Sequence, residues 1–80
     1  MTKLSVLSVF AKADGFLAPD LARRNLQPLP DRRSFYSYVA RLRKQGLLEK
    51  APNSFRGHLR YRITDRGRER ITYLRARNSP

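Results

Sequence analysis

The sequence predicts an α+β fold that is mostly α, with three helices, a two-stranded β-hairpin and a closing helix along its 80 residues. Two patterns predict this fold class. Apolar residues recur at helical spacing through most of the chain, whereas between residues 47 and 63 they alternate with polar ones, as in half-buried strands. Because a chain of this length has room for one domain, we expect residues 1–80 to form a single one.

An apolar segment at the N-terminus predicts the first helix, which Thr2 would cap and the turn at Asp14 and Gly15 would end. Its apolar arc is wider than a surface helix needs. The sequence leaves two explanations open, since the helix is either buried within one chain or partly covered by a second copy. A dimer interface would contain the following side chains, the last of them from the closing helix: Leu4, Leu7, Phe10 and Tyr73.

Pro19 suits the first position of a second helix, predicted over about 19–25, and Asp20 suits its positive end. This helix would contribute three side chains to the core: Leu21, Ala22 and Leu26. Residues 27–30 cannot be helical, because each of their two prolines pushes the preceding residue into extended geometry.

A third helix is predicted over about 31–45, with Asp31 as its N-cap and Gly46 as its C-terminal stop. One arc of this helix is apolar and would pack on the core; it contains Phe35, Tyr38, Val39 and Leu42.

The hairpin is predicted over about 47–63, with strands at 47–51 and 58–63 and a loop at 52–57 between them. Thr64 or Asp65 would cap the closing helix, predicted over about 65–77. Three residues on one face of that helix would meet the core: Gly67, Ile71 and Leu74.

The chain is strongly basic, with 18 Lys plus Arg against 6 Asp plus Glu and a formal net charge of +12. Such a charge opposes compaction through self-repulsion unless a polyanion takes part of it up. Most of these cations are arginines, whose planar forks bind phosphate oxygens and guanine edges in a bidentate way. The charge alone fits DNA, RNA, an anionic membrane or an acidic protein.

The outward arc of the third helix predicts a nucleic-acid interface. It carries Arg33, Ser37, Ala40 and Lys44, flanked by Tyr36 and Arg41, with Arg32 and Arg43 at the sides. A helix that enters the major groove needs long donors for base edges, short residues at its centre and cations for phosphates. We expect base-edge contacts from Arg32, Arg33, Tyr36 and Ser37, and phosphate contacts from Arg41 and Lys44. The alternative is a solvated basic face, but no acid interrupts residues 32–48, whereas solubility faces normally mix signs.

The hairpin holds a second group of arginines. Arg60 and Arg62 share one strand face and are expected to contact phosphates, and Arg56 at the tip is expected to enter the minor groove. Exposed strand positions also carry arginine merely to protect a sheet edge, and that explanation remains open. Phe55 is either a contact to the nucleic acid or a lid on the hairpin.

Three segments resemble the winged helix-turn-helix superfamily, especially small prokaryotic regulators similar to PadR and MarR proteins. They read LAPDLA at 17–22, VARLRKQGLLE at 39–49 and YRITDRG at 61–67. The resemblance implies that 31–45 is a recognition helix, that 52–57 is the wing and that the protein regulates transcription. The connection at 25–30 is longer than is usual for the motif. There is no room for an effector-binding domain, so we expect no small-molecule effector; a small viral, plasmid or mobile-element regulator would fit.

No constellation for catalysis is present, so we expect no enzyme, cofactor or metal. The chain lacks Cys and has a single histidine, His58, with no acid within two positions. The acids are scattered, and most are explained as helix starts or turn formers. No stretch has the length of a membrane span, and no secretory signal is evident, so an intracellular, cytoplasmic and nucleoid-associated location is expected.

Two functions follow from these observations. The first is sequence-specific binding of double-stranded DNA by a small transcriptional regulator, acting as a homodimer, although a monomer remains open. The alternative is a winged-helix adaptor that binds RNA or an acidic protein in a replication, partition or ribosome-associated assembly. Because Tyr36 is the only aromatic residue near the outward arc of the third helix, stacking on single-stranded bases is disfavoured and duplex DNA is preferred.

Overall fold

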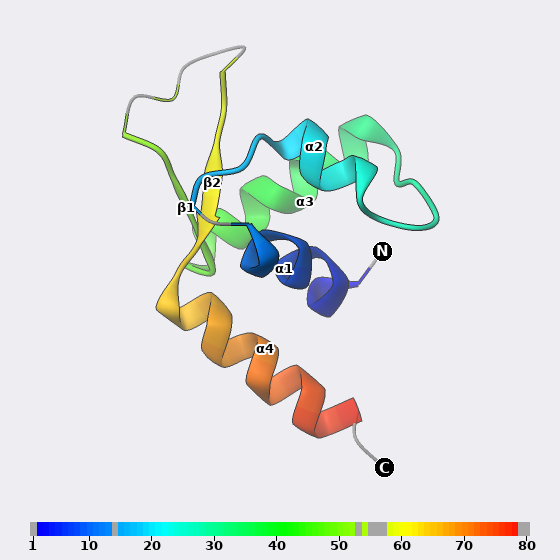
Figure 1. Cartoon of the computed structure of the whole chain (residues 1–80), viewed down its shortest axis with the longest axis vertical. Helices are drawn as coiled ribbons and strands as arrows, with labels where there is room; N and C mark the ends of the chain where they lie inside the picture. The colour runs from blue at the N-terminus through cyan, green and yellow to red at the C-terminus, as the bar shows by residue number, and fades with distance from the viewer. Residues whose placement is uncertain (1, 14, 53, 55–57, 79–80) are drawn as a thin grey trace.

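The computed structural model describes residues 2–13, 15–52, 54 and 58–78. The predicted class is confirmed: the described fold is α+β and mostly helical, with four helices and a two-stranded antiparallel sheet. The elements follow in the order α1 (Lys3–Lys12), α2 (Pro19–Arg24), α3 (Arg32–Lys44), β1 (Leu48–Lys50), β2 (Tyr61–Ile63) and α4 (Asp65–Asn78). Figure 1 shows α1, α2 and α3 beside the hairpin, with α4 extending away from them.

The ends of α1 and α2 follow from local chemistry. The Thr2 hydroxyl accepts a hydrogen bond of 3.1 Å from the Ser5 backbone, and the Ser5 hydroxyl accepts one of 3.1 Å from the Thr2 backbone. This reciprocal capping box satisfies two N–H groups that the first helical turn leaves free. After α1 the chain turns at Gly15, whose φ of 105° lies in a region that residues with a side chain rarely adopt. Pro19 occupies the first turn of α2, where its missing N–H costs nothing.

The long connection between α2 and α3 is held by an arginine. Arg23 donates from Nη1 to the carbonyl oxygen of Pro30 at 3.1 Å, and its Nε lies 3.5 Å from Oδ1 of Asp20. The guanidinium therefore joins the start of α2 to the residue that precedes the cap of α3. This contact fixes the position of a segment that has no secondary structure of its own.

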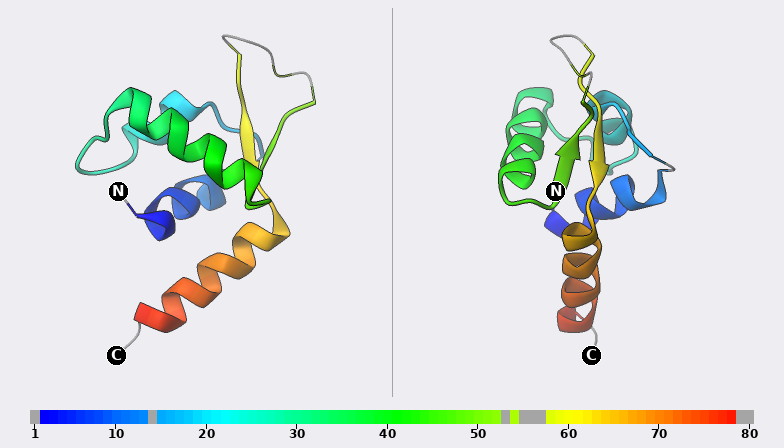
Figure 2. Two further views of the ribbon diagram at one scale, coloured as in Figure 1. Left: turned by 180° about the vertical axis from the view of Figure 1, so that it is seen from behind. Right: turned by 90° about the vertical axis from the view of Figure 1, so that its left-hand side faces the viewer.

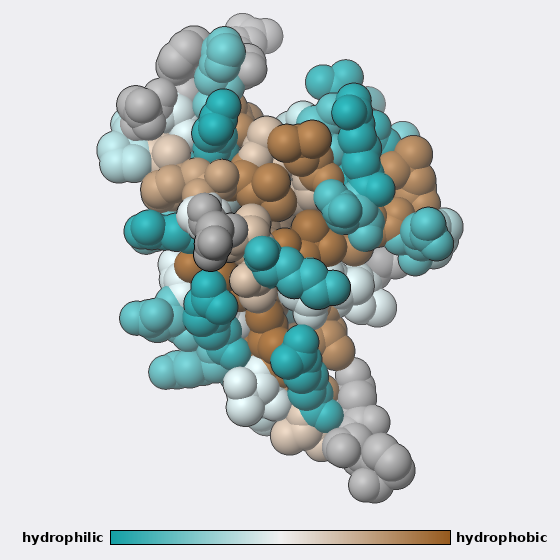
Figure 3. Space-filling view, viewed as in Figure 1, coloured by the Kyte–Doolittle hydropathy of each residue, from teal (hydrophilic) through white to brown (hydrophobic). Residues whose placement is uncertain are grey.

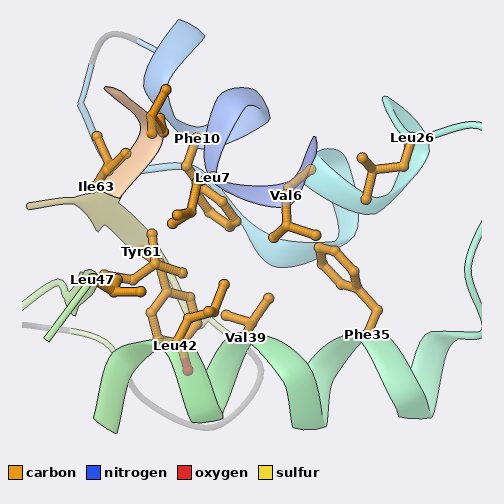
Figure 4. Close-up of a cluster of buried hydrophobic side chains, with 13 residues drawn as sticks. Val6, Leu7, Phe10, Leu26, Phe35, Val39, Leu42, Leu47, Tyr61 and Ile63 are labelled. Carbon is orange, nitrogen blue, oxygen red and sulfur yellow. The ribbon is translucent and has the colours of Figure 1, made fainter. Parts of the chain in front are cut away.

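The core lies between α1, α3 and the hairpin (Figure 4). Its largest fully buried side chains are Val6, Leu7, Phe10, Phe35, Val39, Leu42, Leu47 and Leu48. Ile71 reaches the same cluster from α4, and Ala22 and Leu26 reach it from the region of α2. The wide apolar arc of α1 is thus covered within one chain, chiefly by α4 and β2 and also by α2.

Two predictions about apolar residues are corrected. Leu7 and Phe10 have no exposed surface, so neither can lie in a dimer interface as expected. Of the other two predicted interface residues, Leu4 is half-buried against the core and Tyr73 is 52% exposed. Leu21 does not join the core either: Ala22 on the short α2 and Leu26 just after it are buried, whereas Leu21 is exposed.

The sheet is shorter than predicted. Only three residues pair on each strand, with Glu49 opposite Arg62 at the centre. Towards the tip, the Arg60 N–H donates to the hydroxyl of Ser54 at 3.2 Å instead of to a carbonyl of the opposite strand. The Ala51 N–H still donates to the Arg60 carbonyl oxygen at 2.9 Å, but without the reciprocal bond the regular strand begins only at Tyr61, three residues later than the alternating pattern from 58 to 63 predicts. Leu17 adds an isolated bridge to Tyr61 on the other edge of β2.

The junction between the end of α3 and the start of α4 is tightly bonded. The Thr64 hydroxyl donates to the carbonyl oxygen of Gly46 at 2.6 Å and accepts from the Gly67 N–H at 3.0 Å. The Thr64 N–H donates to the Leu47 carbonyl oxygen at 3.1 Å. A Cβ at Gly67 would lie 2.3 Å from that same oxygen, so glycine permits the close approach. These contacts fix the orientation of α4 relative to the end of α3 and the start of β1.

Candidate nucleic-acid interface

The candidate interface is built on α3, whose sequence divides it into an inner and an outer face. Asp31 caps the helix, because its Oδ2 accepts a hydrogen bond of 3.1 Å from the Ser34 N–H. Phe35, Val39 and Leu42 recur at helical spacing and are buried. The packing of these three side chains turns the opposite face of the helix towards solvent.

The outer face of α3 carries most of the predicted contact residues. All of the following are exposed: Arg32, Arg33, Ser37, Ala40, Arg41, Arg43 and Lys44. Ser37 and Ala40 lie between the cations of the first turn and those of the last turn. Short side chains at the centre would allow the backbone of this helix to approach a groove closely, with donors on both sides.

Tyr36 differs from the other predicted base contacts because it is half-buried. The guanidinium of Arg32 lies 5.6 Å from the centre of its ring, within the range of a cation–π contact. Both side chains line a shallow depression whose other walls come from the start of α2 and from the segment before β2: Ala18, Pro19, Asp20 and Leu59. Arg32 is therefore positioned by Tyr36, and the tyrosine ring serves partly as its support.

Tyr38 lies on the flank of the inner face and is half-buried against the core. Burial raises the pKa of its hydroxyl above the usual value of a tyrosine, and the nearby charge of Arg41 partly offsets this effect. The phenol thus stays neutral at physiological pH and adds no negative charge to the basic face.

The two described hairpin arginines have different surroundings. Arg60 is exposed, with its backbone held by Ser54. Arg62, also predicted to contact phosphate, forms an ion pair with Glu49, to which its Nε donates at 2.7 Å. Its guanidinium also lies 4.6 Å from the centre of the Phe16 ring. Arg56 and Phe55, at the predicted wing tip, lie outside the described residues.

Sequence reasoning missed the roles of Arg23 and Glu49. Arg23 follows Asp20 at a spacing of three, which on a helix brings the two side chains together and was a usable signal. Glu49 meets Arg62 because the two residues are directly opposite in the hairpin register. The sequence could have predicted this cross-strand pair only if the number of residues in the hairpin loop, and therefore the register, had been known.

The helix that carries the basic face packs against β1, and Figure 2 shows α3 beside the hairpin when the molecule is seen from behind. Comparison with protein-family models, with curated proteins and with solved structures finds no match to this chain. In the described residues, no group of three or more His, Cys, Asp or Glu side chains could hold a metal ion. No described helix combines the length and the apolar character needed to cross a bilayer.

Proposed function

We propose that the chain is a sequence-specific double-stranded DNA-binding protein, and a small transcriptional regulator, with a winged helix-turn-helix arrangement. In this proposal α3 docks in the major groove and the hairpin contacts the backbone or the minor groove. The observation that supports it most is the outer face of α3, which is exposed along its length, basic at both ends and small at its centre.

The order of side chains along this face suits a division of tasks. Arg33, in the first turn, has the reach and the planar fork to read a guanine edge in the groove. Ser37 follows one turn later and can donate to either base edge or phosphate. Arg41 and Lys44, in the last turns, lie where cations would contact the phosphates that border the groove.

Electrostatics favour the same partner. The net charge of +12 makes association with a duplex strongly attractive at low salt, since every phosphate contact releases condensed counterions. Arg33, Arg41 and Lys44 are exposed and belong to no ion pair with a described carboxylate. Their charges are thus available to an external anion.

The contact between Arg32 and Tyr36 disfavours the adaptor alternative in its single-stranded RNA form. Recognition of unpaired bases relies on exposed aromatic faces. Tyr36 is half-buried and lies within cation–π distance of Arg32, so part of its ring is already in use. A major-groove contact needs only the edge and the hydroxyl of this residue.

Selection of bound sequences from a random duplex pool tests the proposal. We expect enrichment of a defined motif, and binding of that motif more tightly than of random duplex by a factor of about 10³ or more. A palindromic motif would indicate two copies on one site, and an asymmetric motif would indicate one. Failure to enrich any motif, together with tight binding to RNA or to an acidic protein, would replace the proposal with the adaptor function.

A further inference from the structure

The arginines of α4 take no part in the function proposed above. This helix carries five of them, Arg66, Arg68, Arg70, Arg75 and Arg77, against the two acids Asp65 and Glu69. None of the five forms an ion pair with a carboxylate in the part of the chain that the structure describes. Figure 3 shows hydrophilic side chains on both sides of α4, whereas apolar ones gather over the middle of the molecule.

The helical repeat sorts these arginines onto two flanks. Gly67 and Ile71 face the core, which defines the inner side of α4. At 3.6 residues per turn, one flank collects a group within an arc of about 60°, which we call the α4 stripe. The α4 stripe consists of Arg66, Arg70, Tyr73 and Arg77. Arg68 and Arg75 lie on the opposite flank.

Tyr73 organises the α4 stripe. The guanidiniums of Arg70 and Arg77 lie 5.7 and 5.9 Å from the centre of its ring. The ring is 52% exposed, and of the two cations Arg77 is exposed and Arg70 is half-buried. Two guanidiniums held on one ring lose less side-chain freedom when they bind an anion than two free arginines would.

The α4 stripe begins where the basic face of α3 ends. A Cβ placed on Gly46 would lie 3.6 Å from both Cδ and Nη1 of Arg66. Gly46 lies two residues after Lys44, which with Arg43 supplies the last cations of α3. The Thr64 hydroxyl bonds the same turn to the first turn of α4, so the angle between the two basic surfaces is set. Figure 2 shows α3 and α4 converging at this corner.

We propose that the α4 stripe binds the phosphate backbone of the same duplex, beside the segment that α3 reads; this inference rests on the proposed function. From Arg66 to Arg77 the stripe is about 17 Å long, at a rise of 1.5 Å per residue. Duplex DNA carries one charge per about 1.7 Å of axis, so a stripe of this length faces several phosphates. The helix that carries the stripe extends away from α3 and from the strands of the hairpin (Figure 1), so the stripe would lengthen the contact in one direction.

Charge complementarity selects DNA over a second copy of the chain. Two apposed stripes would bring six arginines together, and like charges at short range repel. A membrane surface is also a poorer fit, because α4 has no exposed apolar face opposite its arginines. Tyr73, which the sequence placed in a dimer interface, has the Arg70 and Arg77 guanidiniums close to its ring, and the carboxylate-bearing Glu69 lines the same depression as Tyr73, Arg66 and Arg70.

The test compares two variants of equal charge on duplexes of different length. The stripe variant is Arg70→Gln/Arg77→Gln, and the matched control on the other flank is Arg68→Gln/Arg75→Gln. Each is measured on a short duplex limited to the selected site and on duplexes extended to one side or the other. Glutamine keeps helix propensity, and thermal unfolding verifies that both variants fold.

We expect the wild-type protein and the control variant to bind more tightly when the duplex is extended on one side. The stripe variant should lose this gain, by about fivefold for each contact removed near physiological salt, and its salt slope on the extended duplex should fall by about 1.8 for two contacts. On the short duplex the stripe variant and the control should bind equally.

Other outcomes separate the two proposals. If the wild-type protein binds no duplex of any length, the proposed function itself fails. If it binds DNA but the stripe and control variants are indistinguishable at every length, the function stands and the role of the α4 stripe is refuted. If the stripe variant changes the sedimenting mass and loses affinity equally on all lengths, this flank is a contact between copies and the inference is also refuted.

Discussion

The hydroxyl of Thr64 donates a 2.6 Å hydrogen bond to the carbonyl oxygen of Gly46 and so joins the end of α3 to the start of α4. The hydroxyl oxygen of Thr64 also accepts a hydrogen bond from the Gly67 N–H, which makes Thr64 the cap of α4 as well. One side chain thus sets both where the closing helix begins and how it is oriented relative to the candidate interface.

Replacing Thr64 with valine should lower the free energy of unfolding by about 1–3 kcal/mol, because it leaves the Gly46 carbonyl and the Gly67 N–H without their partner in a half-buried place. Urea denaturation measures the change. Thr72→Val on the same helix is the matched control. Its hydroxyl is exposed and bonds to Arg68 at 3.3 Å, so we expect an effect within about 0.5 kcal/mol. Equal costs at the two positions would contradict the role assigned to Thr64.

Leu7 has no exposed surface, so its contribution to stability should be made within one chain. Leu7→Ala should lower the free energy of unfolding by about 2–5 kcal/mol at every protein concentration. Leu4→Ala should cost less, since that side chain is only half-buried. Denaturation over a range of concentrations checks both. If the loss at Leu7 depended on protein concentration, α1 would be packing against a second copy rather than against α4 and β2 of its own chain.

Much of this fold could be predicted from the sequence, because its signals are local. The Thr2 cap, Pro19 at the start of α2 and Asp31 at the start of α3 each act within one helical turn, and all three lie where predicted. The strand ends could not be predicted, because regular pairing stops where the Arg60 N–H donates to the hydroxyl of Ser54, six residues away, instead of to a backbone carbonyl oxygen. The alternation of polar and apolar residues, from which the strand was predicted, carries no information about such a side-chain contact.

In the candidate site too, features set by local spacing could be predicted, whereas features set by tertiary packing could not. The outer face of α3 follows from helical spacing, and its predicted members are exposed except for the half-buried Tyr36. The burial of Leu7 could not be predicted, because a wide apolar arc looks the same whether its cover comes from one chain or from two. The contacts of Arg70 and Arg77 with Tyr73 could be predicted, because these residues are three and four positions from Tyr73 on a helix. The role proposed for the two arginines could not be predicted, because it depends on the orientation of α4 relative to α3.

Arg33→Ala should weaken binding to the selected sequence far more than binding to random duplex. The loss of one bidentate base contact costs about 1–3 kcal/mol, whereas the loss of a phosphate contact affects all sequences alike. Arg60→Ala is the comparison of equal charge, and it should weaken both duplexes equally and reduce the salt slope by about one. Competition binding on the two duplexes measures the ratio. Equal losses for Arg33→Ala would assign that residue to the phosphates instead.

The pairing of Arg62 with Glu49 leads to the last prediction. Because the carboxylate and the Phe16 ring hold the guanidinium, Arg62→Ala should reduce the salt slope of DNA binding less than Arg60→Ala does. Glu49→Gln should release Arg62 and strengthen binding to all duplexes, while stability changes by less than about 1 kcal/mol, since the pair is exposed.

A double-mutant cycle separates release of Arg62 from the simple removal of a negative charge. If release is the cause, Glu49→Gln should strengthen binding in the wild-type background and have little effect once Arg62→Ala is present. If the general field of the protein is the cause, the gain should be the same in both backgrounds, because the electrostatic attraction of the whole chain changes by one charge in each. Affinities of the four proteins for one random duplex, measured at two salt concentrations, decide between the two. A gain in affinity that persists in the Arg62→Ala background would mean that Glu49 has no specific effect on Arg62. The original prediction that Arg62 contacts phosphate would then stand.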